Sequence, residues 1–149
     1  MHRLSDGACI RSIGSRGSGS GQFSGGRCGV AFDSEGNLVL ADSCNHRVEV
    51  LRYSDGTHLR TIGSEGAGAG EFQYPSGVAL NVAGRSVVVD RVNHRVQVLR
   101  YSNCAHVGTI GSRCSGNGQR NSPPGGIAID SDGRIVVADT WDHGVQVFE

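Results

Sequence analysis

Several features are scarce or missing in this chain of 149 residues. It contains no lysine, so its 14 basic side chains are all arginines, and 14 acidic side chains balance them. A formal net charge of zero provides no global field that would attract nucleic acid or an anionic membrane. No apolar run approaches the roughly 20 residues of a membrane helix, and the first residues lack the apolar core of a signal peptide. The sequence therefore predicts neither a membrane contact nor secretion.

The five cysteines include no C-x-x-C pair and have no regular spacing. An odd, irregular set indicates neither a disulfide framework nor a zinc finger. We therefore expect reduced thiols, a cytoplasmic location and no metal or other cofactor.

Aromatic residues make up only 5% of the chain and the hydrophobic fraction is 37%, whereas glycine occurs 24 times. Glycine favours tight turns and weakens the interior of helices and strands. A thin, layered core between many turns is typical of a β protein with short strands.

A ten-residue segment occurs twice with one residue changed, as NHRVEVLRYS from Asn45 and as NHRVQVLRYS from Asn93, and a weaker copy, DHGVQVFE, begins at Asp142. At this offset of 48 residues, or one more, other segments also align. They are the Ile-Gly-Ser triplets at 13–15, 62–64 and 110–112, the glycine-rich loops that follow, and the apolar segments GVAFD, GVALN and GIAID. The chain is therefore an internal repeat.

Each repeat contains four short apolar runs of about five residues, separated by turn signals such as Asp55-Gly56 and Asp132-Gly133. No run has a sustained helical period. Four strands in a repeat of about 40 to 50 residues are typical of a propeller blade. We predict an all-β chain, a β-propeller of four-stranded antiparallel blades with about three blades.

The order of a glycine-rich loop, G-V-A-x-D, an apolar run ending in Ala-Asp, and Asn-His-Arg-Val-x-Val resembles the NHL repeat over essentially the whole chain. The third repeat departs from this pattern, because Arg120 replaces the phenylalanine of Phe23 and Phe72, and the 142–144 segment lacks the Asn and Arg. The resemblance implies that three repeats form half of a six-bladed ring. In members of this family the propeller recruits protein substrates or binds RNA stem-loops.

We expect one domain over 1–149, with repeats at about 14–62, 63–110 and 111–149, and with residues 1–13 as the closing outer strand. Leu4 to Ile13 resembles the last strand of a blade, and the final repeat stops after its third strand. Three blades cannot surround an axis without severe strain. Two readings follow, namely a homodimeric six-bladed ring or a piece of a longer propeller.

Histidines recur at one place in every repeat, but equivalent positions are spread around a propeller and need not converge on a metal ion. We interpret the motif residues as structural, with each imidazole linked to its own blade through the preceding aspartate. This structural set is Asn45, His46, Arg47, Asn93, His94, Arg95, His143, Asp42, Asp90 and Asp139.

No catalytic residue is predicted. The G-x-G-x-G loops lack the lysine and the following helix of a phosphate loop, and no G-x-S-x-G elbow is present. The alternative is a metal-dependent six-bladed enzyme similar to peptidyl-hydroxyglycine lyases, whose ligands would lie on the innermost strands. Those segments contain only Asp33 and Asp130 as charged candidates.

The remaining prediction is a noncatalytic interaction module. Between Arg85 and Arg120 there are six arginines and one acid, and Trp141 is the single tryptophan. Arginine and aromatic side chains dominate binding hot spots and can stack on bases, although Trp141 can equally pack between blades. A protein is the expected partner and RNA the alternative, at a surface containing Arg85, Arg91, Arg95, Trp141, Tyr74 and Arg120.

Overall fold

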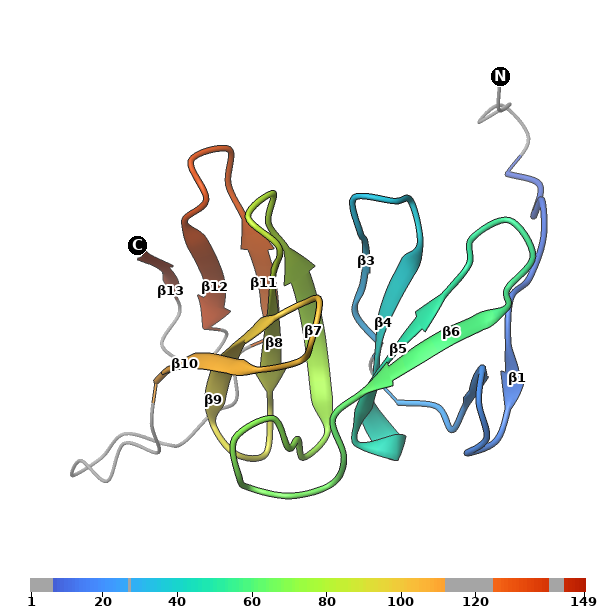
Figure 1. Ribbon diagram of the computed structural model, residues 1–149, viewed down its shortest axis with the longest axis horizontal. Helices are drawn as coiled ribbons and strands as arrows, with labels where there is room; N and C mark the ends of the chain where they lie inside the picture. The colour runs from blue at the N-terminus through green and yellow to red at the C-terminus, as the bar shows by residue number, and fades with distance from the viewer. Residues whose placement is uncertain (1–6, 27, 112–124, 140–143) are drawn as a thin grey trace.

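A computed structural model describes residues 7–26, 28–111, 125–139 and 144–149, and these form an all-β fold (Figure 1). Three antiparallel sheets stand side by side like the leaves of a fan, with β1 at one end and β13 at the other. Each sheet follows the chain order of its strands. No helix among the described residues is long and apolar enough to cross a membrane.

Each sheet corresponds to one repeat and is called a blade here. Blade 1 contains β3 (Val30–Phe32), β4 (Leu38–Asp42), β5 (Arg47–Leu51) and β6 (His58–Ile62), with the short 3-10 helix η1 (Ser43–Asn45) before β5. Blade 2 contains β7 (Pro75–Leu80), β8 (Arg85–Asp90), β9 (Arg95–Arg100) and β10 (His106–Ile110). Blade 3 contains β11 (Gly126–Ile129), β12 (Ile135–Asp139) and β13 (Gly144–Phe148). The prediction of antiparallel propeller-like blades is confirmed, with four strands in blades 1 and 2 and three described strands in blade 3.

The first glycine-rich loop precedes blade 1, and the second connects blade 1 to blade 2. In the first loop β1 (Ser15–Arg16) and β2 (Gln22–Phe23) form a two-residue parallel pair. The second loop repeats this geometry in a parallel bridge between Glu65 and Phe72. The loops thus fold back on themselves and place a phenylalanine at equivalent positions, and Phe72 is fully buried.

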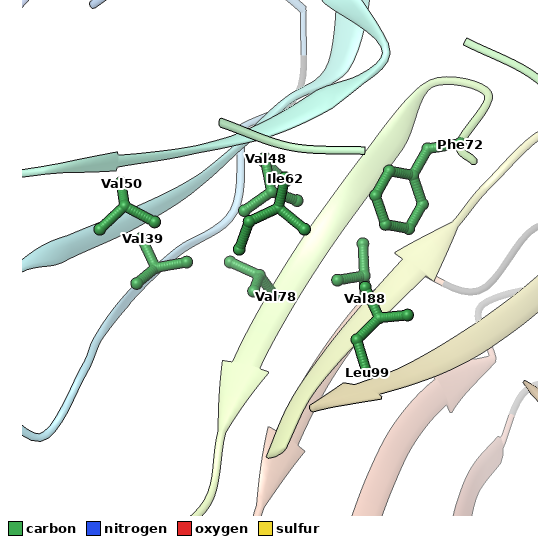
Figure 2. Close-up of a cluster of buried hydrophobic side chains, with 9 residues drawn as sticks. Val39, Val48, Val50, Ile62, Phe72, Val78, Val88 and Leu99 are labelled. Carbon is green, nitrogen blue, oxygen red and sulfur yellow. The ribbon is translucent and has the colours of Figure 1, made fainter. Parts of the chain in front are cut away.

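Blades 1 and 2 pack face to face. The rear face of blade 1 is the surface turned toward blade 2, and the front face of blade 2 is the surface that it meets. Figure 2 shows the side chains of the two faces pointing toward one another. Blade 1 contributes Val39, Val48, Val50 and Ile62, and blade 2 contributes Phe72, Val78, Val88 and Leu99. Burying a side chain of this size stabilises a fold by about 1.5–3 kcal/mol. The interface between two neighbouring blades, called a seam here, is therefore a main source of stability.

Blades 2 and 3 use the same faces one repeat later. The rear face of blade 2 contributes Val87, Val89, Val96 and Val98, and Ile127, Ile129, Ile135, Val137 and Phe148 of blade 3 pack against it. Both faces of blade 2 are therefore covered, which explains the run of buried valines in β8. This run breaks the polar–apolar alternation of a strand with one solvated face.

The innermost strands approach one another closely. A Cβ on Gly29 would lie 2.7 Å from the Gly77 Cα and 2.8 Å from the Ser76 carbonyl oxygen. These obstacles are backbone atoms, which a rotamer change cannot remove. Glycine is therefore required where β3 and β7 converge.

Residues 7–13 are the described part of the segment that we expect, at 1–13, to be the closing outer strand. They belong to no strand, and residues 1–6 lie outside the described part of the chain. A strand is defined by a hydrogen-bonded neighbour, and within the described residues no sheet includes this segment. It instead contacts the turn between β5 and β6 through Arg11.

Candidate interaction surface on the glycine-loop face

The motif residues gather at one edge of the blades, which we call the glycine-loop face. This edge carries the loops at 63–74 and 91–94 and η1, on the lower side of Figure 1. The opposite edge, the hairpin face, carries the turns at 33–37, 52–57, 81–84 and 101–105. Candidate binding residues are therefore judged by the edge on which they lie.

Asp90, fully buried at the end of β8, organises the second glycine-loop segment. Its carboxylate accepts hydrogen bonds from Asn93 Nδ2 at 2.9 Å, Arg95 Nε at 2.7 Å and the Gln73 amide at 2.7 Å. Arg95 and Asn93 also donate to carbonyl oxygens of the glycine loop, at Gly68 and Gly66. A buried carboxylate needs such compensation for lost solvation. The motif thus holds the loop to its blade.

Blade 1 repeats the arrangement. Asn45 Nδ2 donates to Asp42 Oδ2 at 2.7 Å and to the Gly17 carbonyl oxygen at 3.0 Å. Arg47 forms an ion pair with Asp42 at 3.4 Å and donates to loop carbonyl oxygens at Ser18, Gly19 and Gln22. The Asn and Arg of the repeated segment therefore have structural roles in both complete repeats.

His46 corrects the expectation that each imidazole links its own blade to the preceding aspartate. Its Nδ1 accepts a hydrogen bond from the Tyr74 amide at 3.1 Å, across the seam in the next blade's loop. The two rings also meet edge to face, with centroids 4.3 Å apart. Asn45 and Arg47 both contact Asp42 through Oδ2, whereas the imidazole is directed toward the neighbouring blade.

Tyr74 is the centre of the exposed part of this seam. Its side chain is 39% exposed, and its backbone φ of 50° lies in the left-handed region, which is rare for a bulky residue. Arg91 lies over the ring at 5.9 Å, and Glu65 approaches His46 Nε2 at 3.9 Å. We call these four residues, His46, Glu65, Tyr74 and Arg91, the seam surface.

The predicted partner-binding set does not form one surface. Arg91 and Tyr74 lie together on the glycine-loop face, whereas Arg85 is at the other end of β8, opposite Arg100 in the sheet register. Arg95 is on the glycine-loop face, but Asp90 and the loop carbonyls occupy its guanidinium. Arg120, Trp141 and His143 lie outside the described residues, and Asp139 is placed only as the last residue of β12.

The hairpin face has its own cross-blade cluster, which the sequence analysis missed. Tyr101 of blade 2 donates its hydroxyl to Asp33 Oδ2 of blade 1 at 2.9 Å, and Arg60 stacks on the Tyr101 ring at 4.2 Å. These residues line a pocket of about 500 Å³ together with Leu59 and Arg100. The repeated RYS segment was the available signal, because a tyrosine recurs there at 53 and 101.

The hydrogen bonds of this cluster perturb both ionisable groups. Partial burial acts to raise the pKa of Asp33, but hydrogen bonds from Asn37, Tyr101 and the Glu35 amide outweigh it and lower the pKa. Burial and the bond to Asp33 raise the pKa of Tyr101 to about 12. At neutral pH the pair is therefore a charged acceptor with a neutral donor.

The described part of the chain offers few side chains that could bind a metal ion. No group of three His, Cys, Asp or Glu side chains is arranged to hold an ion within residues 7–26, 28–111, 125–139 and 144–149. Asp33 is one of the two charged candidates on the innermost strands, and its carboxylate accepts hydrogen bonds from two turn amides and from the Tyr101 hydroxyl. Asp130 similarly accepts from the Asp132 amide and from Arg134.

Comparison with known families supports the repeat assignment. The family model described as NHL repeat matches residues 29–51, 72–99 and 123–148, which together make up just over half of the chain. Among curated proteins, none is similar enough in sequence to count as a match.

Several solved structures share the fold at low identity. The WD40 β-propeller domain of Doa1 has a TM-score of 0.60 at 16% identity, covering 80% of this chain and 35% of that one. Glutaminyl cyclase from Myxococcus xanthus has a TM-score of 0.59 at 14% identity, covering 85% and 57%. An inactive virginiamycin B lyase from Staphylococcus aureus, crystallised with quinupristin, has a TM-score of 0.58 at 15% identity, covering 81% and 40%. The chain thus spans less than two thirds of each of these structures.

Proposed function

The chain belongs to the NHL-repeat family, and on this premise we propose that it is a noncatalytic interaction module that binds a protein partner on its glycine-loop face. The solved relatives include enzymes and a WD40 domain, and identities of 14–16% carry the fold alone. Function must therefore be argued from side chains.

The observation that carries the proposal is the position of Tyr74. The ring is fixed by an edge-to-face contact with His46 and by a backbone bond to the same imidazole, yet the residue is 39% exposed beside Arg91. A rigid, partly exposed aromatic next to an arginine loses little entropy on binding and is typical of an interface hot spot. Glu65, with a side chain 68% exposed, adds a polar contact at the rim.

A protein partner is favoured over RNA by the distribution of arginines. Arg47 and Arg95 are committed to the glycine loops, and Arg85 and Arg100 lie at the far end of blade 2 from Arg91. Phosphate binding needs several free cations along one track. The described glycine-loop face supplies few of them.

The test is a quantitative capture experiment with two matched double variants. Tyr74→Ala with Arg91→Glu alters the seam surface, while Arg85→Glu with Arg100→Glu changes charge on the opposite edge. The proposal expects one specific cellular protein retained by the wild type and by the hairpin-face variant, and at least tenfold less by the seam variant. Equal retention by both variants would refute the assigned surface.

RNA binding and metal content are measured on the same purified protein. A labelled RNA hairpin that binds at low salt and dissociates steeply between 50 and 200 mM salt would make RNA the partner, since steepness counts phosphate contacts. A stoichiometric metal in the purified protein would favour the alternative of a metal-dependent propeller enzyme. We expect neither result.

The proposal includes two further elements. The ring is closed by additional blades, from a second copy or from a longer chain. The protein is placed in the cytoplasm, where thiols stay reduced, in line with the free state of Cys9, Cys28, Cys44 and Cys104. Partial burial raises the pKa of Cys28, which favours the protonated thiol.

A further inference from the structure

Residues 7–13 reproduce the contacts that an outer strand makes with the following blade. In the chain, β6 of blade 1 contacts blade 2 through Arg60, which stacks on Tyr101 at 4.2 Å and donates to the Ser102 carbonyl oxygen at 3.3 Å. Arg11 does the same one repeat earlier. It stacks on Tyr53 at 4.7 Å and donates to the Ser54 carbonyl oxygen.

The local geometry of this segment is also that of an outer strand. His58 contacts Thr61 at 3.0 Å in β6, and His106 contacts Thr109 at 2.9 Å in β10. The equivalent Cys9 and Ser12 approach to 4.0 Å. Residues 7–13 therefore lie against blade 1 as the outer strand of a preceding blade would.

The rear face of blade 3 lacks the cover that the same face has elsewhere. Val145 is 64% exposed, whereas its equivalents Val48 and Val96 are 1% and 2% exposed. Val147 is 58% exposed, although its equivalent Val98 is buried. Within the described residues β13 pairs only with β12, so its other edge is open.

The front face of blade 1 is open in the complementary way. Val30 is 58% exposed, whereas the equivalent Val78 of blade 2 is 4% exposed because it packs on blade 1. Phe32 is likewise exposed, and its equivalent Leu80 is partly buried at the seam. The two open faces lie at opposite ends of the fan and cannot meet within one chain (Figure 1).

We propose that a second copy of this chain covers both faces, with residues 9–13 of each copy adding to the β13 edge of the other as a fourth strand. The contact continues the seams already present, because a rear face of the repeat again meets a front face. The occupant that fits a front face and an outer strand together is another copy of this repeat. Two copies then form a closed ring of six blades through two identical seams.

The internal blades fix the register of the new pair. In β5 and β6, Val48 lies opposite Ile62, Glu49 opposite Thr61, and Val50 opposite Arg60. The same register places Ile13 of one copy opposite Val145 of the other, Ser12 opposite Gln146, and Arg11 opposite Val147. Since Arg11 already holds the segment against its own blade 1, little of it needs to be ordered on binding.

A hydrogen bond across the new seam also follows from the repeat. Tyr101 reaches Asp33 of the preceding blade at 2.9 Å. Tyr53 is the equivalent tyrosine of blade 1, and Asp130 occupies in blade 3 the turn position of Asp33. The closed ring therefore places the Tyr53 hydroxyl of one copy beside Asp130 of the other.

This inference rests on the ring closure in the proposed function and not on partner binding at the seam surface. The test uses a Cys9→Ser background, which removes the thiol next to position 12. The two positions chosen for cysteine are Ser12 and Gln146, because the corresponding side chains within blade 1, Thr61 and Glu49, meet at 3.1 Å. Ser12→Cys and Gln146→Cys are made as separate single variants. Both positions are exposed in the single chain, so neither change disturbs its core.

The two single variants are oxidised alone and as an equal mixture, and are then separated without reductant. We expect a covalent dimer in the mixture at least tenfold more abundant than in either variant alone. The chain carrying both changes should give the same dimer and no higher species. A mixture without dimer, or a ladder of larger oligomers from the double variant, overturns the closed pair.

A charge on the open face gives a second readout. Val147→Asp should reduce the molar mass in solution by half, whereas Val82→Asp, at a fully exposed turn position, should leave it unchanged. Circular dichroism establishes that both variants are folded. Equal masses for the two variants contradict the inference. Partner capture depends on Tyr74 and Arg91, which lie at the seam between blades 1 and 2, so its failure would not affect this result.

Discussion

The Tyr101 hydroxyl of blade 2 donates a 2.9 Å hydrogen bond to the Asp33 carboxylate of blade 1. The bond crosses the seam at the hairpin face, outside the apolar core that joins the same blades. Two amides of the turn, those of Glu35 and Asn37, hold the carboxylate in place. Blades 1 and 2 are thus joined by a polar link at the hairpin face as well as by valines.

Removing this link should weaken the seam in a way that depends on pH. Tyr101→Phe keeps the ring under Arg60 but deletes the donor, and we expect a loss of about 1 kcal/mol of unfolding free energy. Urea unfolding of the variant and the wild type over a range of pH measures the difference.

The sign of the pH dependence follows from the two shifts. The lowered pKa of Asp33 contributes stability that is present above about pH 4 and is lost as the pH falls through the folded value. The raised pKa of Tyr101 contributes stability that is present below about pH 10 and is lost as the pH rises toward 12. The wild type should therefore exceed the variant most between these limits, and a difference independent of pH would contradict the assignment.

Asp90 is expected to be among the most sensitive polar positions. Asp90→Ala leaves the Arg95 guanidinium, Asn93 and the Gln73 amide without their common acceptor in a buried site. Breaking a buried pair costs about 3–5 kcal/mol, so thermal unfolding should occur at a much lower temperature. Asp132→Ala is the control, because its ion pair with Arg134 is exposed and should matter little. Similar melting temperatures for the two variants would argue against the structural role of the motif.

Gly29 should not tolerate even one added methyl group. Gly29→Ala places a Cβ 2.7 Å from the Gly77 backbone, and the required separation of β3 from β7 should cost about 1–3 kcal/mol. Gly108→Ala in β10 is the matched control, since its Cβ would meet nothing within 4 Å. Chemical denaturation of both variants tests this, and a Gly29 variant as stable as the Gly108 variant would place the inner strands farther apart than described.

The blades could be predicted from the sequence because the repeat itself carries the information. Alternating apolar runs and turn signals recur at equivalent positions, so the strands found at Leu38–Asp42 and Arg85–Asp90 follow from local pattern. The burial of Phe72 could also be predicted from the sequence, because a phenylalanine at the end of a polar, glycine-rich loop packs into the core.

Contacts between blades could not be predicted in the same way. His46 and Tyr74 are far apart in sequence and meet only after two blades have packed, and Tyr101 reaches Asp33 for the same reason. The separation of Arg85 from Arg91 was hidden because residues close in sequence lie at opposite ends of one strand. Residues 7–13 belong to no strand because none of the three described sheets supplies them with a hydrogen-bonding neighbour.

The molar mass of the unmodified chain in solution, from light scattering on a size-exclusion column, tests the ring most directly. The account predicts a single species near twice 15.6 kDa at micromolar concentration, because the valines exposed on blades 1 and 3 become buried in two new seams. A folded, monodisperse species of 15.6 kDa that keeps this mass as concentration rises would contradict it.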